Sequence, residues 1–309
     1  MEQYHIPVMF DECMEALQVK DGGVYFDGTL GGGSHTFGLL SRGGKVIATD
    51  LDDDAIEYCR RRYENSPFAE NLTVVKSNFK NFTSVINKAG IKKIDGAILD
   101  LGISSHQVDE AERGFSFRQD SRLDMRMDRS QELTAYEIVN EWPQEKLTNV
   151  IFDYGEEKFA RRIASNICRY RQKKNIETTL ELAEIVRHSV DSATMKNGHP
   201  AKRTFQAIRI AVNDELGGLG DVLADITDRL STGGRLAVIT FHSLEDRIVK
   251  RKFAELATGC ICDKSLPVCV CGHKAEVKLI GKYKPGEKET ERNSRSTSAT
   301  LRVVEKLPK

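Results

Sequence analysis

A glycine-rich turn followed at a fixed distance by an acid offers the most specific chemistry in this chain. The short β-branched and aromatic run Val24–Asp27 ends in an acid, and four glycines follow within six residues. A strand that ends in such a turn lets a cofactor approach bare backbone, because glycine has no side chain. A second acid, Asp50, ends the run Lys45–Asp50 and lies 22 residues after Gly28. That spacing suits a carboxylate that holds the ribose hydroxyls of an adenosine-containing cofactor.

A third acid, Asp100, ends the apolar run Gly96–Asp100 and is followed by Gly102, Ser104 and Ser105. Because parallel strands end at one edge of a sheet, these polar groups would lie beside the glycine-rich turn. The structural alternative makes Asp100 a turn residue and the serines helix caps. We favour the functional interpretation because the neighbouring runs predict parallel strands.

These residues need a sheet to position them, and five short apolar runs bounded by turn residues predict its parallel strands. The runs are Val24–Asp27, Lys45–Asp50, Leu72–Lys76, Gly96–Asp100 and Arg235–Phe241. Helices are expected at Thr36–Ser41, Asp53–Tyr63, Phe82–Ala89 and Asn213–Leu230, and an antiparallel hairpin at Val277–Tyr283 and Thr300–Lys306. The alternation of strands and helices predicts an α/β fold with a doubly wound sheet.

A long, charged and mostly helical segment interrupts this alternation after Asp100. We predict that residues 1–108 and 206–309 form a cofactor-binding domain and that residues 109–205 form an inserted helical domain. The insertion would emerge at the edge of the sheet where ligands bind in open α/β folds, which places it well to hold a substrate.

The composition describes a globular protein, since 39% of the 309 residues are hydrophobic and 30% are charged. The sequence has no apolar run near the roughly 20 residues of a membrane span, and its first residues do not resemble a signal peptide. We therefore expect a cytoplasmic protein with reduced cysteines and no membrane partner. The net charge of zero does not announce a nucleic-acid partner, but residues 158–174 hold seven Lys or Arg and no acid. This stretch is either a solvated helix face or a surface for RNA.

Three further motifs are open to two interpretations each. The arginines and aromatics of Glu112–Phe117 and Arg122–Asp128 suit stacking on bases, or else they dock on the core. His242, after the fifth strand, is a candidate site residue or a structural histidine. Four thiols and His273 lie within fourteen residues and either close on zinc or form a reduced surface loop, and the sequence leaves this choice open. The thiols are Cys260, Cys262, Cys269 and Cys271.

Taken together, long motifs along the chain resemble one family, the bacterial ribosomal RNA small subunit methyltransferase H family. The resemblance runs from His5–Val8 to Asn293–Ser296. The motifs that carry it are Asp27–His35, Asp100–Ser105, Glu112–Phe117, Leu123–Asp128, Arg203–Arg209 and Phe241–Arg247.

The resemblance implies a Rossmann-like class I methyltransferase sheet that uses S-adenosylmethionine, with an inserted helical RNA-recognition domain. The reaction it implies is methylation of N4 of a decoding-centre (P-site) cytidine of 16S rRNA in the small ribosomal subunit, and a homodimer is compatible with it. The alternatives are a non-catalytic RNA-binding assembly factor and, less favoured, a nicotinamide oxidoreductase. The last expects Gly-x-Gly-x-x-Gly, but Thr36 stands at the third glycine position.

The family's cofactor contacts fall on residues at or after the ends of the first four predicted strands. The contacts carried over in this way are Gly33, Ser34, His35, Asp50, Phe79, Asp100 and Gln107. Acceptors for the N4 hydrogens would be Asp100, Ser104 or Ser105. Ser34 departs from the Gly-Gly-His usual in the family. It keeps the backbone N–H and fits if the backbone there is not left-handed.

Overall fold

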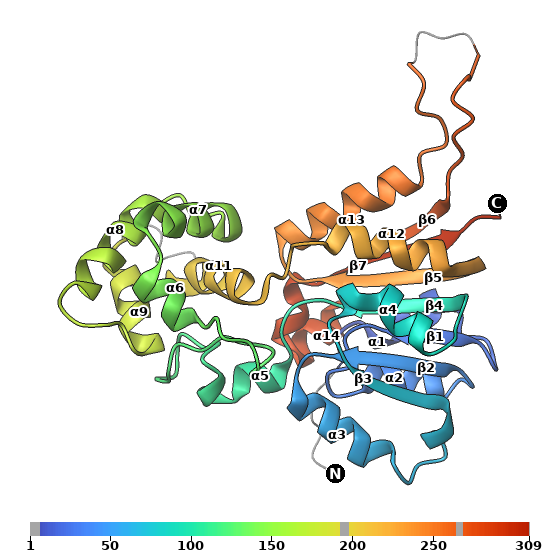
Figure 1. Ribbon diagram of the computed structural model, residues 1–309, viewed down its shortest axis with the longest axis horizontal. Helices are drawn as coiled ribbons and strands as arrows, with labels where there is room; N and C mark the ends of the chain where they lie inside the picture. The colour runs from blue at the N-terminus through green and yellow to red at the C-terminus, as the bar shows by residue number, and fades with distance from the viewer. Residues whose placement is uncertain (1–6, 192–197, 264–267, 309) are drawn as a thin grey trace. The chain divides into compact units, whose positions relative to one another are not determined.

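The computed structural model describes residues 7–191, 198–263 and 268–308 (Figure 1). The chain forms two compact units, one from Met1–Gly102 with Gly217–Lys309 and the other from Ile103–Leu216. The predicted insertion of residues 109–205 lies inside the second unit. His5 and Ile6, at the start of the first family motif, lie outside the described residues.

The first unit is built on a seven-stranded sheet with the order β3-β2-β1-β4-β5-β7-β6. The first five strands pair in parallel, and β7 pairs antiparallel with both β5 and β6. The strands are β1 (Val24–Asp27), β2 (Lys45–Asp50), β3 (Leu72–Lys76), β4 (Ile94–Asp100), β5 (Leu230–Thr240), β6 (Val277–Tyr283) and β7 (Thr300–Lys306). The predicted α/β fold, its five parallel strands and its hairpin are confirmed.

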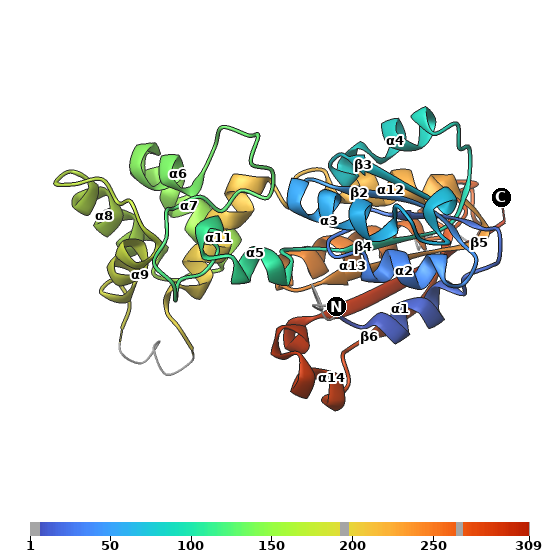
Figure 2. The ribbon, with the colours of Figure 1, turned by 90° about the horizontal axis from the view of Figure 1, so that it is seen from below.

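Helices cover both faces of this sheet, and each face has its own apolar core (Figure 2). One face carries α1 (Phe10–Leu17), α2 (Ser34–Leu40) and α3 (Asp53–Tyr63), and the other carries α4 (Phe82–Lys88), α12 (Leu219–Arg229) and α13 (Ser243–Leu256). The remaining short helices of the unit are η1 (Ala69–Asn71), η2 (Phe79–Asn81), α14 (Glu287–Arg292) and η4 (Ser294–Ser298). Because both faces are covered, the central strands are apolar throughout, which is why their runs are legible in the sequence.

The predicted helix Asn213–Leu230 is wrong in its first part. The preceding helix α11 (Ala201–Asn213) ends there, and Asp214 and Gly218 take left-handed backbone with φ of 46° and 68°. The helix α12 begins only after this turn. The predicted domain boundary at residue 205 consequently falls inside α11, whose Phe205 and Ile208 are buried in the core of the second unit.

The second unit is a helical bundle with its own apolar core. Its helices are α5 (Ser105–Asp109), η3 (Ala111–Arg113), α6 (Ala135–Glu141), α7 (Gln144–Gly155), α8 (Ala160–Arg171), α9 (Thr179–Arg187) and α11. On α8 the buried residues recur at intervals of three and four, namely Ala160, Ile163, Ala164 and Ile167. Of the helices in the described part of the chain, none is both long and apolar enough to cross a membrane.

The structure supports the core interpretation for four residues of the arginine and aromatic motifs in this unit. Phe115, Leu123 and Met125 are buried in its core. Arg113 is 2% exposed and donates to the carbonyl oxygens of Arg126 and Met127 at 3.0 and 3.1 Å. These residues therefore hold the loop together from inside, so they do not form a surface for bases.

Candidate active site

The glycine-rich turn joins β1 to α2, and one face of α3 holds its carbonyl groups. The Cys59 thiol, the Arg62 guanidinium and the Tyr63 hydroxyl donate, at 3.3, 3.0 and 2.9 Å, to three consecutive carbonyl oxygens. The acceptors belong to Gly31, Gly32 and Gly33. Donors at positions i, i+3 and i+4 share one face of a helix. The acceptor side of the turn is therefore occupied by protein.

The donor side of the turn is different. Gly31 N–H donates to Oδ2 of Asp50 at 2.8 Å, whereas the N–H groups of Gly32 and Ser34 have no partner among the described residues. Gly33 is the N-cap of α2 with φ 73°, and Ser34 is the first helical residue. The left-handed conformation falls on Gly33, so Ser34 fits the turn. Free N–H groups at a helix start are donors for polar or anionic ligand atoms.

A buried carboxylate, Asp27, fixes both ends of this turn. Its Oδ1 accepts the N–H of Thr29 at 3.0 Å and its Oδ2 accepts the Thr36 hydroxyl at 2.7 Å. The residue is 1% exposed, and burial raises its pKa to about 6 despite these hydrogen bonds. Thr36 is the residue that stands where a dinucleotide-binding turn would have its third glycine, and here its side chain closes the turn.

Asp50 ends β2 with both carboxylate oxygens toward the backbone. Oδ2 accepts from Gly31, and Oδ1 accepts the N–H of Asp52 at 2.9 Å. Burial raises the pKa of Asp50. The carboxylate is thus held in place at the edge of the turn, where its remaining lone pairs can accept hydrogen bonds from hydroxyl groups.

Asp100, at the end of β4, has a buried side-chain oxygen without a hydrogen-bond partner among the described residues. Its backbone N–H donates to the Thr29 hydroxyl at 2.7 Å, which ties β4 to the glycine-rich turn. Its side chain is 19% exposed, and the buried Oδ1 has no hydrogen-bond partner in the described part of the chain. His35 Nδ1 lies 3.9 Å from Oδ2, which is too far for a hydrogen bond.

Burial, and after it the charges of Asp27, Glu245 and Glu289, raise the pKa of Asp100 to about 8. A buried acceptor without a partner is expensive for a folded protein, and such groups concentrate at functional sites. The arrangement indicates that the Asp100 carboxylate accepts a hydrogen bond from a ligand or forms an ion pair with a positively charged ligand group.

Phe79, in η2 after β3, packs directly on the start of the turn. A methyl group placed on Gly28 would lie 2.3 Å from Cδ2 of Leu99 and 2.9 Å from Cβ of Phe79. Only glycine fits at that position. The structure thus brings the predicted Gly33, Ser34, His35, Asp50, Phe79 and Asp100 to the carboxyl edge of the parallel strands.

The other three predicted residues, Ser104, Ser105 and Gln107, belong to the second unit. Ser104 is the N-cap of α5. Its hydroxyl accepts the N–H of Gln107 at 3.2 Å, and Oε1 of Gln107 accepts the N–H of Ser104 at 3.1 Å. Ser104 therefore has the helix-capping role of the structural alternative, whereas Ser105 is the first residue of the helix.

His242 also has a structural role. It is the N-cap of α13, its Nδ1 accepts the N–H of Glu245 at 3.4 Å, and its Nε2 lies 3.2 Å from Oε1 of the same residue. Both side chains are buried. The position after the fifth strand suggested a site, but a histidine can cap a helix as Ser or Asp does.

The sequence did not identify Asp27, Thr36, Arg62 or Tyr63 as parts of this site. Asp27 was visible as the end of a strand and as the first residue of a family motif, but it was given no role in the site. The α3 residues carry one signal, since Cys59, Arg62 and Tyr63 share a helix face and follow the acid Asp50. That signal is weak alone, because such a face is ordinarily a core face.

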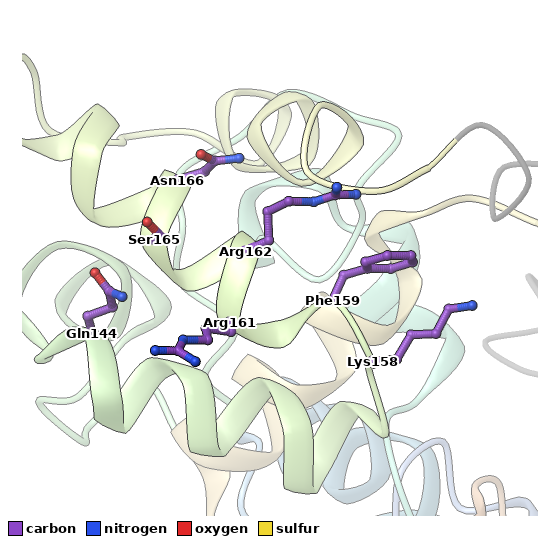
Figure 3. Close-up of a pocket in the computed structure, with 7 residues that line it drawn as sticks. All are labelled: Gln144, Lys158, Phe159, Arg161, Arg162, Ser165 and Asn166. Atoms are coloured by element: carbon purple, nitrogen blue, oxygen red, sulfur yellow. The ribbon is translucent and has the colours of Figure 1, made fainter.

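A second candidate feature lies on the helical unit, where α7 and α8 border a surface pocket of about 400 Å³ (Figure 3). The pocket is lined by Gln144, Lys158, Phe159, Arg161, Arg162, Ser165 and Asn166. Arg162 pairs with Asp191 at 2.8 Å, whereas Arg161 and Lys158 form no ion pair with described residues. The Lys158 ammonium lies 5.1 Å from the centre of the Phe159 ring. Cations, amides and an aromatic ring together suit a phosphate or a base.

Comparison with known proteins gives one family for the whole chain. The model of the MraW methylase family matches residues 2–307. Relatives named "Ribosomal RNA small subunit methyltransferase H" are similar along their full length. The protein of Symbiobacterium thermophilum is 50% identical over 313 residues, which cover 99% of this chain and 98% of the relative.

Two further relatives of that name match as completely. The protein of Clostridium botulinum is 48% identical over 312 residues, covering 99% of this chain and all of the relative. The protein of Brevibacillus brevis is 46% identical over 310 residues, covering 98% of each.

Proposed function

The chain belongs to the MraW methylase family, and from this premise we propose that it methylates N4 of a decoding-centre cytidine in 16S rRNA, using S-adenosylmethionine. The observation that carries the assignment of the site is the buried, unpartnered Oδ1 of Asp100 beside a glycine-rich turn. When bound, S-adenosylmethionine supplies an electrophilic methyl group on a positively charged sulfur.

The donor set fits this cofactor. The free N–H groups at Gly32 and Ser34, with Gly33 and His35 around them, suit its polar groups, and Asp50 suits the ribose hydroxyls. Phe79 offers a ring beside the turn for the adenine. Gln107 is the proposed contact from the second unit, where its backbone and amide also cap α5.

The amine at N4 of cytosine is a poor nucleophile because its lone pair is conjugated with the ring. Most of the acceleration should therefore come from holding N4 in line with the bond between methyl and sulfur. A C–N bond forms, the C–S bond breaks with its electron pair kept by sulfur, and N4 gives up a proton. We assign the acceptance of the N4 hydrogen to Asp100, whose pKa of about 8 suits a proton acceptor near neutrality. Ser104 and Ser105 are the alternative acceptors.

Methyl transfer from labelled S-adenosylmethionine to small ribosomal subunits, with mass mapping of the product, tests this function. We expect one methyl group on N4 of a cytidine. A non-catalytic assembly factor would bind RNA without transfer, and label on another atom or RNA would contradict the substrate assignment. Calorimetry with NAD tests the oxidoreductase alternative. That alternative is disfavoured because Thr36 occupies the position of the third glycine in a dinucleotide-binding turn.

Replacing Gly33 by alanine should weaken cofactor binding by at least about tenfold. The new Cβ would be strained at φ 73° and would lie 2.8 Å from Sγ of Cys59, so the backbone of the turn or the Cys59 side chain must shift. Gly31→Ala is the matched control. Its φ is 46°, but no heavy atom lies closer than 4.0 Å, so only about 1 kcal/mol of strain is expected. Titration calorimetry measures both, and equal affinities for the two variants would contradict the proposed geometry.

For RNA we propose the pocket between α7 and α8 as a contact surface of the second unit. The basic residues of the C-terminal segment are less suitable, since several are engaged internally. Lys284 donates to the Ala299 carbonyl at 3.1 Å, Arg302 pairs with Asp246 at 2.7 Å, and Lys306 pairs with Glu276 at 3.0 Å. Lys158 and Arg161 keep their charges available for phosphates.

The double variant Lys158→Ala and Arg161→Ala should bind the RNA substrate at least about tenfold more weakly at physiological salt. Each lost phosphate contact should also reduce the slope of log affinity against log salt by about 0.7–0.9. Lys88→Ala, an exposed lysine of α4, is the control and should change neither. Filter binding over a salt series measures this, and an unchanged slope in the double variant would argue against the pocket.

We further propose that the substrate is presented within the small ribosomal subunit and that the protein acts in the cytoplasm. The homodimer compatible with the family stays a prediction, which analytical ultracentrifugation of the full chain can test.

A further inference from the structure

The segment between α13 and β6 leaves the body of the first unit and returns to it, as Figure 1 shows. Its two ends are joined by the Glu276 N–H, which donates to the Leu256 carbonyl at 2.8 Å. Between residues 258 and 276, no described residue is buried, and Ile261, Val268 and Val270 are 64%, 70% and 77% exposed. A segment without a core of its own needs another source of order, such as a metal or a disulfide.

Four cysteines converge within this segment. Sγ of Cys269 lies 3.5 Å from that of Cys260, 3.9 Å from that of Cys262 and 3.6 Å from that of Cys271. Sγ of Cys271 lies 3.8 Å from that of Cys260. All four sulfur atoms lie within 4.8 Å of one another. From these distances we propose that Cys260, Cys262, Cys269 and Cys271 bind one Zn²⁺ ion as thiolates.

The distances match those of a tetrahedral ion. With Zn–S bonds of about 2.3 Å, the sulfur atoms of a tetrahedral site are about 3.8 Å apart. The four separations given above, 3.5 to 3.9 Å, bracket this value. They are far longer than a disulfide bond of about 2.05 Å. An iron–sulfur cluster places several ions between its thiolates and would hold them much farther apart.

The backbone around the sulfurs also suits a thiolate site. The N–H of Val270 donates to Sγ of Cys262 at 3.3 Å. Gly272, directly after the last cysteine, has φ 63°, a conformation that glycine adopts easily. Hydrogen bonds of this kind orient metal-bound sulfur and offset its negative charge. The soft ligand set selects zinc over magnesium or calcium.

The sequence alone did not decide this question because C-x-C pairs are rarer than C-x-x-C pairs in zinc sites. In the structure, the C-x-C spacing no longer argues against a zinc site. Each pair contributes two sulfurs to the same cluster, and no tight chelate within a pair is needed when the other pair completes the tetrahedron.

Metal analysis of the full-length protein, purified under reducing conditions without chelator, tests the proposal. We expect about one zinc per chain in the wild type and less than about a tenth of that in Cys262→Ser with Cys271→Ser. Cys168→Ser, a half-buried cysteine of α8, is the control and should keep its zinc. Titration with a mercurial reagent should release the zinc in step with four thiols.

A second measurement does not depend on the variants. Removal of zinc from the wild type should speed tryptic cleavage at Lys274 at least about tenfold, and added zinc should restore protection. A metal-free wild type that takes up no zinc would overturn the proposal. So would iron in place of zinc, or disulfides among the four cysteines in the freshly purified protein.

Discussion

Asp100→Asn should reduce methyl transfer by at least about 10³-fold, because it removes the charge and the proton acceptor of the site together. The amide is nearly isosteric with the carboxyl group, so Thr29 can still accept the backbone N–H of residue 100 and hold β4 to the turn. Single-turnover transfer of a labelled methyl group to small ribosomal subunits measures the loss. Near-normal turnover would remove Asp100 from the chemistry and leave Ser104 and Ser105 as candidates.

Asp95→Asn is the matched control, since Asp95 lies on the same strand near its other end. Its Oδ2 accepts the Val24 N–H at 3.0 Å, and an amide oxygen can replace it. We expect activity within about twofold of the wild type. If both variants lose activity equally, the effect of Asp100→Asn is structural.

Asp100→Asn should also stabilise the folded protein at pH 8. The pKa of Asp100 is about 8 in the folded protein and 3.8 as its ordinary value, so the folded state binds the extra proton between these limits. Stability therefore falls as the pH rises from about 4 to 8, and burial of the ionised carboxylate costs on the order of a few kcal/mol. Chemical denaturation at pH 5 and pH 8 should show this loss in the wild type and a smaller one in Asp100→Asn. An equal loss in both would contradict the raised pKa.

Two parts of the site could be predicted from the sequence, namely the strand ends and the glycine-rich turn. The strand ends were legible because covered parallel strands are continuously apolar, and a change to Asp at their ends stands out. The turn was legible because glycines are needed where a Cβ would strike a neighbour, as at Gly28 against Leu99.

What could not be predicted depends on contacts between distant segments. Cys59, Arg62 and Tyr63 have the spacing of an ordinary core face, and only the fold shows that they hold the carbonyl groups of the glycine-rich turn. Arginine side chains are usually exposed, but Arg113 is buried, and its hydrogen bonds to two loop carbonyl oxygens offset the loss of hydration. The convergence of four sulfurs across the segment from 260 to 271 is likewise a property of the fold.

The boundary errors have local causes. The residues after Asn213 have the composition of a helix, but the backbone there is not helical. Asp214 and Gly218 adopt left-handed conformations between α11 and α12. The fifth strand was predicted to begin at Arg235, but β5 begins at Leu230, and its register with β4 shifts between Ile94 and Gly96. A strand irregularity and a turn share the same residue types.

The affinity for S-adenosylmethionine should rise with pH, by up to about 50-fold between pH 6 and pH 8, and level off about one pH unit higher. At pH 6 the carboxyl group of Asp100 holds its proton, because its pKa is about 8, and a positively charged ligand must displace that proton to gain the ion pair. Each pH unit below 8 then weakens binding by at most about tenfold. S-adenosylhomocysteine is the control ligand, since it shares the amino and carboxylate groups but has an uncharged sulfur.

Calorimetry with both ligands across this range isolates the contribution of the sulfur charge, as the ratio of their association constants. The ratio should climb with pH in the wild type and stay flat in Asp100→Asn, and a flat ratio in both would separate Asp100 from the sulfonium. A climbing ratio has a consequence for the reaction. Asp100 would be ionised while the positive sulfur is beside it and would regain a pKa of about 8 once the methyl group has left. It would become a proton acceptor at the moment when N4 has a proton to give.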